Sequence, residues 1–167
     1  MLDAALSDDL SKLHASSFGW AMSCCGRDRS EAEDVLQEAY WKVLSGKARF
    51  DGRASLRTWL FGVIRLTALE RRRWRFTRRR EVPTSQPPDA PSSEPVVDRE
   101  TREALAKALA KLSLRQREVV HLVFYEELTI EDAAKIMGVS LGSARTHYER
   151  GKASLLKWLK QEGVEKP

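Results

Sequence analysis

Apolar residues recur at intervals of three and four along most of the chain, with polar residues between them, which is the spacing of amphipathic helices. In the segment from Ser30 to Leu44 this spacing predicts one buried face, made of Ala32, Val35, Leu36, Ala39, Tyr40, Val43 and Leu44. Ser30 and Glu33 have the spacing of a capping box, so this helix is expected to begin at Ser30.

Two other helices are predicted in the first half of the chain. One begins near Ser55, after the sequence RFDGRA, and continues through an arginine-rich run, with four inward-facing residues: Leu56, Leu60, Val63 and Thr67. A less regular helix is expected from about residue 4 to residue 24, with an interruption at Gly19.

Four helices are predicted from residue 98 onward, and capping residues mark where they begin: Asp98, Ser113 with Gln116, Thr129 with Asp132, and Ser140. Gly138 is expected to end the third of these helices. The last two helices, joined across the sequence GVS, form a predicted helix-turn-helix.

The periodicity predicts an all-α fold, because no strand-like alternation of useful length occurs. Residues 81–97 contain five of the six prolines together with serines and acids, a composition that favours extended chain over a packed core. The sequence therefore predicts two small helical domains, residues 1–80 and 98–167, joined by a flexible linker over residues 81–97.

Charge is concentrated in one segment of the chain. The net charge is +5, yet residues 53–80 contain ten arginines and one acid, while residues 81–97 contain three acids and no Lys or Arg. Such a concentrated positive stretch indicates a polyanionic partner.

Other function classes find little support in the sequence. Cys24 and Cys25 are adjacent and are interpreted as reduced core residues, with a structural zinc or a redox switch as the alternative. No metal and no cofactor is expected. Phosphate-binding glycine loops and nucleophile motifs are missing, which argues against an enzyme. No apolar run is long enough for a membrane span and the first residues are acidic, so a cytoplasmic protein is expected.

The final helix of the helix-turn-helix has a polar face that fits a DNA major groove. Placed on a helical wheel, Gly142, Ser143, Thr146, Glu149, Arg150 and Ala153 lie opposite the apolar side, with Arg145 and Lys152 flanking them. Arginine can pair with guanine and glutamate can accept from the cytosine amino group. An ordinary solvated helix face shows the same pattern, so the motif alone leaves both interpretations open.

Three stretches together carry a family resemblance: EAEDVLQEAYWKVL, RFDGRASLRTWLFGVIRLTALERRR and LAKLSLRQREVVHLVFYEELTIEDAAKIMGVSLGSARTHYERGKASLLKWL. In this order, with the linker between the second and third, they resemble an extracytoplasmic-function sigma factor of bacterial RNA polymerase. The resemblance implies a specificity subunit without catalysis of its own, monomeric when free. Its implied partners are core RNA polymerase, promoter DNA and an anti-sigma factor.

The resemblance also implies roles for individual residues. Four residues correspond to the surface that docks on the clamp helices of the largest polymerase subunit: Asp34, Gln37, Glu38 and Trp41. An acidic surface with an aromatic anchor suits a basic partner.

Contacts with the −10 promoter element are implied for Phe50, Arg53, Ser55, Arg57, Trp59, Arg65, Leu66 and Arg72. Such a surface requires aromatic or apolar side chains that pack against unstacked bases, and arginines that contact phosphates. Leu66 departs from the family, where asparagine is usual, which puts −10 specificity in doubt. Trp59 is equally compatible with a role in the core.

Contacts with the −35 element are implied for Ser143, Arg145, Thr146, Glu149 and Arg150. Glu149 stands where basic residues are usual in the family, so the accepted base can differ. Two alternatives remain open at this stage: an autonomous helix-turn-helix regulator that binds its operator without polymerase, and a sigma-like decoy that occupies an anti-sigma factor.

Overall fold

The structure, a computed structural model, describes residues 4–78 and 99–163, and these residues contain helices and connecting turns but no strand. The chain divides into two compact units, residues 1–89 and 90–167, which are described separately below. The expected all-α fold is confirmed. The expected linker, residues 81–97, lies outside the described residues, so its limits remain a prediction.

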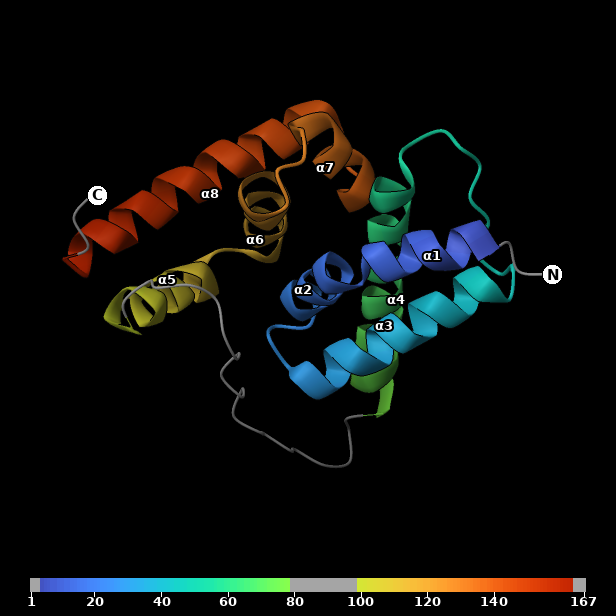
Figure 1. Ribbon diagram of the computed structural model, residues 1–167. Coiled ribbons are helices and arrows are strands. Elements are labelled where there is room, and N and C mark those ends of the chain that lie inside the picture. Colours follow the sequence, from blue (N-terminus) through green and yellow to red (C-terminus); the bar gives the residue numbers. More distant parts are fainter. Residues whose placement is uncertain (1–3, 79–98, 164–167) are drawn as a thin grey trace. The chain divides into compact units, whose positions relative to one another are not determined.

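The first unit contains α1 (Ala4–Lys12), α2 (His14–Cys24), α3 (Arg29–Leu44) and α4 (Leu56–Arg78) (Figure 1). Helices α2, α3 and α4 pack against one another. At their centre, the fully buried rings of Trp20 and Phe61 stack with their centroids 5.9 Å apart. The Trp20 indole nitrogen donates to the Phe61 carbonyl oxygen at 3.0 Å, which satisfies its only polar group inside the core.

Two predicted features of α1 to α3 are wrong. Helix α3 is capped by Asp28, whose side chain accepts from the Glu31 amide, and Glu33 pairs with Arg29 at 3.0 Å instead of closing a box with Ser30. The expected interruption at Gly19 is absent, since this residue lies within α2, and the break falls at Leu13. Burial of the α2 face that contains Trp20 outweighs the cost of about 1 kcal/mol for a helical glycine.

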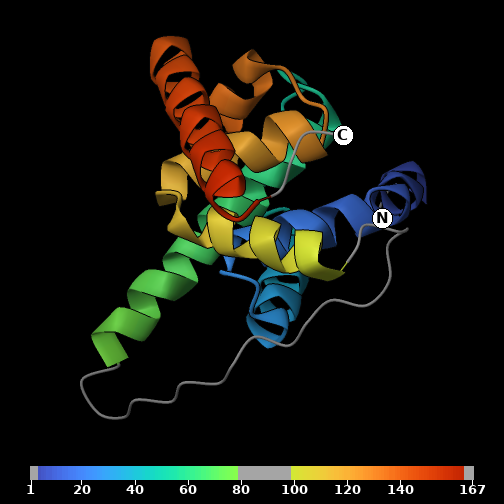
Figure 2. The same cartoon turned by 90° about the vertical axis from the view of Figure 1, so that its left-hand side faces the viewer.

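The inward face of α4 is wider than the single stripe predicted from sequence. Leu60 and Thr67 are buried as expected, whereas Leu56 and Val63 are half-buried. Phe61, Ile64, Arg65 and Ala68 are also buried. Because α4 packs on both α2 and α3, it covers a broad arc, and the quarter turn of Figure 2 shows its C-terminal turns emerging from the bundle.

Helix α3 ends with an exposed residue. Leu44, predicted to be buried, is 42% exposed, and Tyr40 is half-buried. Val43 is the last buried position of α3, and the next residue is rotated by about 100° around the helix axis, away from the core.

The second unit contains α5 (Arg99–Lys111), α6 (Leu114–Val120), a π-helical turn η1 (His121–Tyr125), α7 (Ile130–Met137) and α8 (Leu141–Gln161). The sequence LRQREVVHLVFY, residues 114–125, has the periodicity of a single α-helix. Instead the helix widens after Val120, and the Glu126 amide donates to the His121 carbonyl oxygen at 3.1 Å. The π-helical turn leaves Leu122 buried while Phe124 and Tyr125 are exposed.

The predicted N-cap residues Ser113, Thr129 and Ser140 are confirmed, while Asp98 lies outside the described residues, and the Asp132 carboxylate accepts from the Thr129 hydroxyl. Ser113 and Gln116 form a complete capping box, and Thr129 caps α7 by accepting from the Asp132 amide. Gly138 ends α7 in the left-handed conformation, with φ at +64°, and Ser140 caps α8 two residues later. These caps fix the sharp turn between α7 and α8, so the helix-turn-helix is present (Figure 1).

Helix α8 packs against α6, and Gly151 lies at the point of contact. A Cβ atom placed on Gly151 would lie 3.0 Å from Cγ2 of Val120, closer than carbon atoms normally approach. The backbones of α6 and α8 can therefore come close at this point, and the opposite face of α8 is turned to solvent.

Candidate nucleic-acid and polymerase interfaces

The outward face of α8 contains all five residues predicted to read DNA. Each is exposed: Ser143, Arg145, Thr146, Glu149 and Arg150. Ala144 and Gly151 on the other side are buried, as the wheel predicted. The structure therefore brings this predicted set together on one free face of the second helix of the helix-turn-helix.

Hydrogen bonds and ion pairs within α8 leave its two arginines as the most available groups. Thr146 donates its hydroxyl to the Gly142 carbonyl oxygen at 3.0 Å, and Glu149 lies 3.6 Å from the Lys152 ammonium. No acid in the described parts of the chain forms an ion pair with Arg145 or Arg150. Their guanidinium groups can therefore pair with base edges or phosphates.

Residues from the loop before α4 and its first turns form a second exposed group. Phe50 and Trp59 lie with ring centroids 5.3 Å apart, Phe50 being 43% exposed and Trp59 half-buried. Ser55 caps α4 by accepting from the Thr58 amide. Arg53 is almost fully exposed beside Asp51. The structure thus brings the two aromatic rings together, and the same loop offers an exposed cation, Arg53, three residues after Phe50. Aromatic rings and cations are the groups that bind bases and phosphates.

The other predicted −10 residues are partly covered or lie farther along α4. Arg57 is half-buried, with its guanidinium 5.4 Å from the centre of the Phe61 ring, and Arg65 is only 7% exposed. Leu66 is 57% exposed farther along α4. Arg72 donates to the Cys24 carbonyl oxygen at 3.3 Å and lies about 20 Å along the helix from Trp59.

Helix α3 presents the acidic surface predicted from the sequence. Asp34 and Trp41 are about half exposed, Gln37 is exposed and Glu38 is partly covered. The Trp41 ring lies under the Lys47 ammonium, 4.2 Å from its centroid. The four side chains share one side of α3, so a partner can contact them together.

The acids of this surface take part in a network that sequence reasoning missed. Glu31, Asp34 and Glu38 recur at intervals of three and four on α3 and all contact Arg71 of α4, at 3.0, 3.2 and 3.2 Å. Arg75 also pairs with Glu31, which is nearly buried. The hydrogen bond that Arg71 donates to the Glu31 carboxylate is the main reason that the pKa of Arg71 is raised, against the opposing effect of burial.

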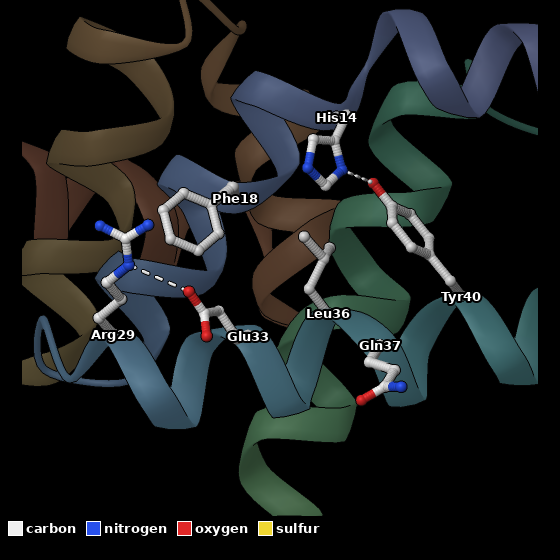
Figure 3. A pocket seen from close by; sticks show the side chains of 7 residues that line it. All are labelled: His14, Phe18, Arg29, Glu33, Leu36, Gln37 and Tyr40. Atoms are coloured by element: carbon white, nitrogen blue, oxygen red, sulfur yellow. Dashed lines mark hydrogen bonds and ion pairs between the residues drawn. The ribbon is translucent and has the colours of Figure 1, made fainter.

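A hollow of about 370 Å³ lies between α2 and α3 and reaches Gln37 of the acidic surface (Figure 3). Phe18 and Leu36 line its apolar part. At its rim the His14 ring nitrogen Nδ1 lies 3.1 Å from the Tyr40 hydroxyl oxygen. Burial raises the pKa of Tyr40, so its hydroxyl stays protonated.

Within residues 4–78 and 99–163, the structure shows no group of three or more His, Cys, Asp or Glu side chains that could hold a metal ion. None of the helices in these segments combines the length and apolarity needed to cross a bilayer.

Comparison with known proteins identifies the family. The family model for sigma-70 region 2 matches residues 12–80, and that for sigma-70 region 4 matches residues 102–155. The RNA polymerase sigma factor YlaC of Bacillus subtilis is 33% identical over 133 residues, which cover 75% of this chain and 76% of the relative. The ECF RNA polymerase sigma factor EcfG of Rhodopseudomonas palustris is 31% identical over 167 residues, 98% of this chain and 90% of the relative. This chain belongs to the ECF sigma factors.

Solved structures agree with this assignment. The sigma factor RpoE from Bartonella quintana, solved in complex with the anti-sigma factor NepR, is 25% identical with a TM-score of 0.77, covering 95% of this chain and 98% of that one. CnrH, solved with the cytosolic domain of CnrY, shares the fold at 19% identity and a TM-score of 0.64. The protein is thus a sigma factor that directs RNA polymerase to promoters, and its region 2 and region 4 contain the surfaces described above.

Proposed function

We propose that region 2 of this sigma factor docks on the clamp helices of the largest polymerase subunit through Asp34, Gln37, Glu38 and Trp41. The exposed acidic side of α3 supports this role, because it offers carboxylates around one half-exposed tryptophan. An aromatic anchor surrounded by charge is a common arrangement at the centre of a protein interface. Polymerase, and not the sigma factor, then performs the chemistry, in the cytoplasm.

Promoter contacts are proposed for both regions, with residues 81–97 as the tether between them. The free polar face of α8, with Arg145 and Arg150 unpaired among the described residues, is the observation that carries a −35 role for the second unit. The Phe50–Trp59 pair with Arg53 supports a −10 role for the loop before α4. Burial of Arg65 favours a packing role for this residue over DNA contact.

An anti-sigma factor is proposed as a further partner. The Bartonella sigma factor, whose fold extends over nearly all of this chain, was solved with such a protein bound. Competition between an anti-sigma factor and polymerase for the same sigma surface would keep the factor inactive until a signal releases it.

Promoter-directed transcription tests the proposal. The full chain is mixed with core polymerase and a genomic library, and transcripts are sequenced to find promoters that depend on it. A D34K/E38K variant should lose core binding by about 100-fold or more, because like charges then face the basic partner. The matched control is D8K/D9K, which reverses two exposed acids of α1 in the same unit.

The outcomes separate the competing interpretations. Transcripts that depend on Asp34 and Glu38 but not on the α1 acids support the proposed surface. Specific binding of the isolated chain to promoter duplex, without polymerase and unaffected by D34K/E38K, would favour the autonomous regulator. Core binding without any transcript would favour the decoy.

A further inference from the structure

The proposed polymerase surface is already occupied in part by a side chain of the same molecule. The Arg71 guanidinium contacts Glu31, Asp34 and Glu38 through three different nitrogens. Glu31 is nearly buried and is also held by Arg75, so it belongs to the interior of the unit. Asp34 and Glu38 are the exposed members, and they are two residues of the proposed polymerase surface.

Few carboxylate oxygens of this pair remain available. Arg71 takes Oδ2 of Asp34 and Oε2 of Glu38, and the Lys42 ammonium lies 3.5 Å from the other oxygen of Glu38. A partner arginine that pairs with both oxygens of either carboxylate must therefore share one oxygen with Arg71 or displace it.

We propose that Arg71 is an internal competitor that lowers the affinity of the acidic α3 surface for core polymerase. When polymerase binds, basic side chains of the clamp take over the oxygens of Asp34 and Glu38, and Arg71 keeps its contact with Glu31. This inference rests on the proposed function of the α3 surface, and it adds a residue of α4 that regulates the strength of that contact.

Two opposing effects of Arg71 decide the sign. Arg71 holds Asp34 and Glu38 in fixed rotamers, which lowers the conformational entropy lost when a partner docks on them. This gain is small, because ion pairs of partly exposed carboxylates restrain their side chains only weakly. A cation of the partner that pairs with Asp34 or Glu38 comes close to the Arg71 guanidinium, because both contact the same carboxylates. Repulsion at this range, in the intermediate dielectric of a protein surface, exceeds the gain from ordering. Removal of Arg71 should therefore tighten polymerase binding.

The experiment measures the affinity of the full-length protein for core polymerase at two salt concentrations. Arg71→Gln should bind core about threefold to tenfold more tightly than the wild type at low salt, and this difference should shrink as salt screens the charge. The matched control is Arg75→Gln, which removes the same charge from the same helix but contacts Glu31 and not Asp34 or Glu38. It should change core affinity less than twofold.

A second variant, Arg71→Lys, keeps the test possible if Arg71→Gln does not fold. Arg71→Lys keeps the charge, but its single ammonium cannot contact three carboxylates as the guanidinium does, so tightening should be intermediate. Circular dichroism shows which of the two Arg71 variants remains folded, and the folded one decides the test.

Some results overturn the inference while leaving the proposed function intact. If Arg71→Gln binds core equally well or more weakly, Arg71 is not a competitor. If Arg71→Gln and Arg75→Gln tighten binding equally, overall charge is responsible and not the occupied oxygens. By contrast, a wild-type chain that fails to bind core, or one whose binding is insensitive to D34K/E38K, overturns the proposed function itself.

Discussion

Gly151 determines how closely the recognition helix α8 packs on α6, and its replacement by alanine tests this packing. The added Cβ would lie 3.0 Å from Cγ2 of Val120 and 3.3 Å from Cβ of Gln116, whereas carbon atoms prefer separations of about 3.5–4.0 Å. Val120 is only 4% exposed and lies at the end of α6. Its β-branched side chain is nearly fixed at χ1 in a helix, so it cannot rotate away.

Two energies compete in Gly151→Ala. Alanine gains about 1 kcal/mol over glycine inside a helix. Overpacking a rigid core position costs about 1–3 kcal/mol. Because Val120 is almost fully buried, the second effect should prevail, and the second unit should lose about 1 kcal/mol of stability. Replacement of Val120 by alanine removes the clashing methyl, so Gly151→Ala should become stabilising in that background.

Hydrogen exchange of α6 and α8 amides in the full chain is the suitable assay, because it reports the stability of the second unit separately from the first. The double-mutant cycle should give a coupling of about 1–2 kcal/mol between the two positions. If Gly151→Ala alone increases protection of these amides, α8 can shift away from α6 without cost. The contact between Gly151 and Val120 then does not determine the position of α8 on α6.

Three other substitutions give measurable outcomes. Gly138→Ala should destabilise the second unit by about 1 kcal/mol in the same exchange assay, because φ is +64° there while the added Cβ meets no atom within 4 Å. Burial raises the pKa of Cys25 from 9.0 to about 12, so folding disfavours the thiolate; the urea midpoint should fall between pH 9 and 12, and by less in Cys25→Ala. Arg145→Ala should weaken binding to the −35 element by about 1–3 kcal/mol in polymerase-dependent footprinting, with specificity lost mainly at one base pair.

The sequence predicted those parts of the structure that depend on local interactions. The caps at Ser113, Thr129 and Ser140 and the left-handed Gly138 were found correctly, because each depends on residues within four positions. The exposed face of α8 followed from helical periodicity. Local patterns fail where two signals compete: both Asp28 and Ser30 can cap α3, and only the folded chain shows that Asp28 does so.

The remaining differences arise from contacts between helices. A wheel drawn for α4 alone gives one inward stripe, but packing on both α2 and α3 also buries Arg65, which was predicted to face DNA. The pairing of Arg71 with Asp34 joins residues 37 positions apart, and no pattern within either helix predicts it. The family matches establish the class of protein, while the environment of each side chain requires the packed unit.

The ion pairs between the arginines of α4 and the acids of α3 change how the charge of these segments is interpreted. The arginine excess of residues 53–80 indicates a polyanionic partner, yet two of these arginines, Arg71 and Arg75, pair with α3 acids of the same unit. Polymerase docking on Asp34 and Glu38 therefore exchanges one ion pair for another and releases few bound ions. In Arg71→Gln these carboxylates attract solvent counterions, which docking must expel, so core affinity should fall more steeply with salt than in the wild type. Parallel salt dependences for the two proteins would show that Arg71 does not neutralise these acids in solution.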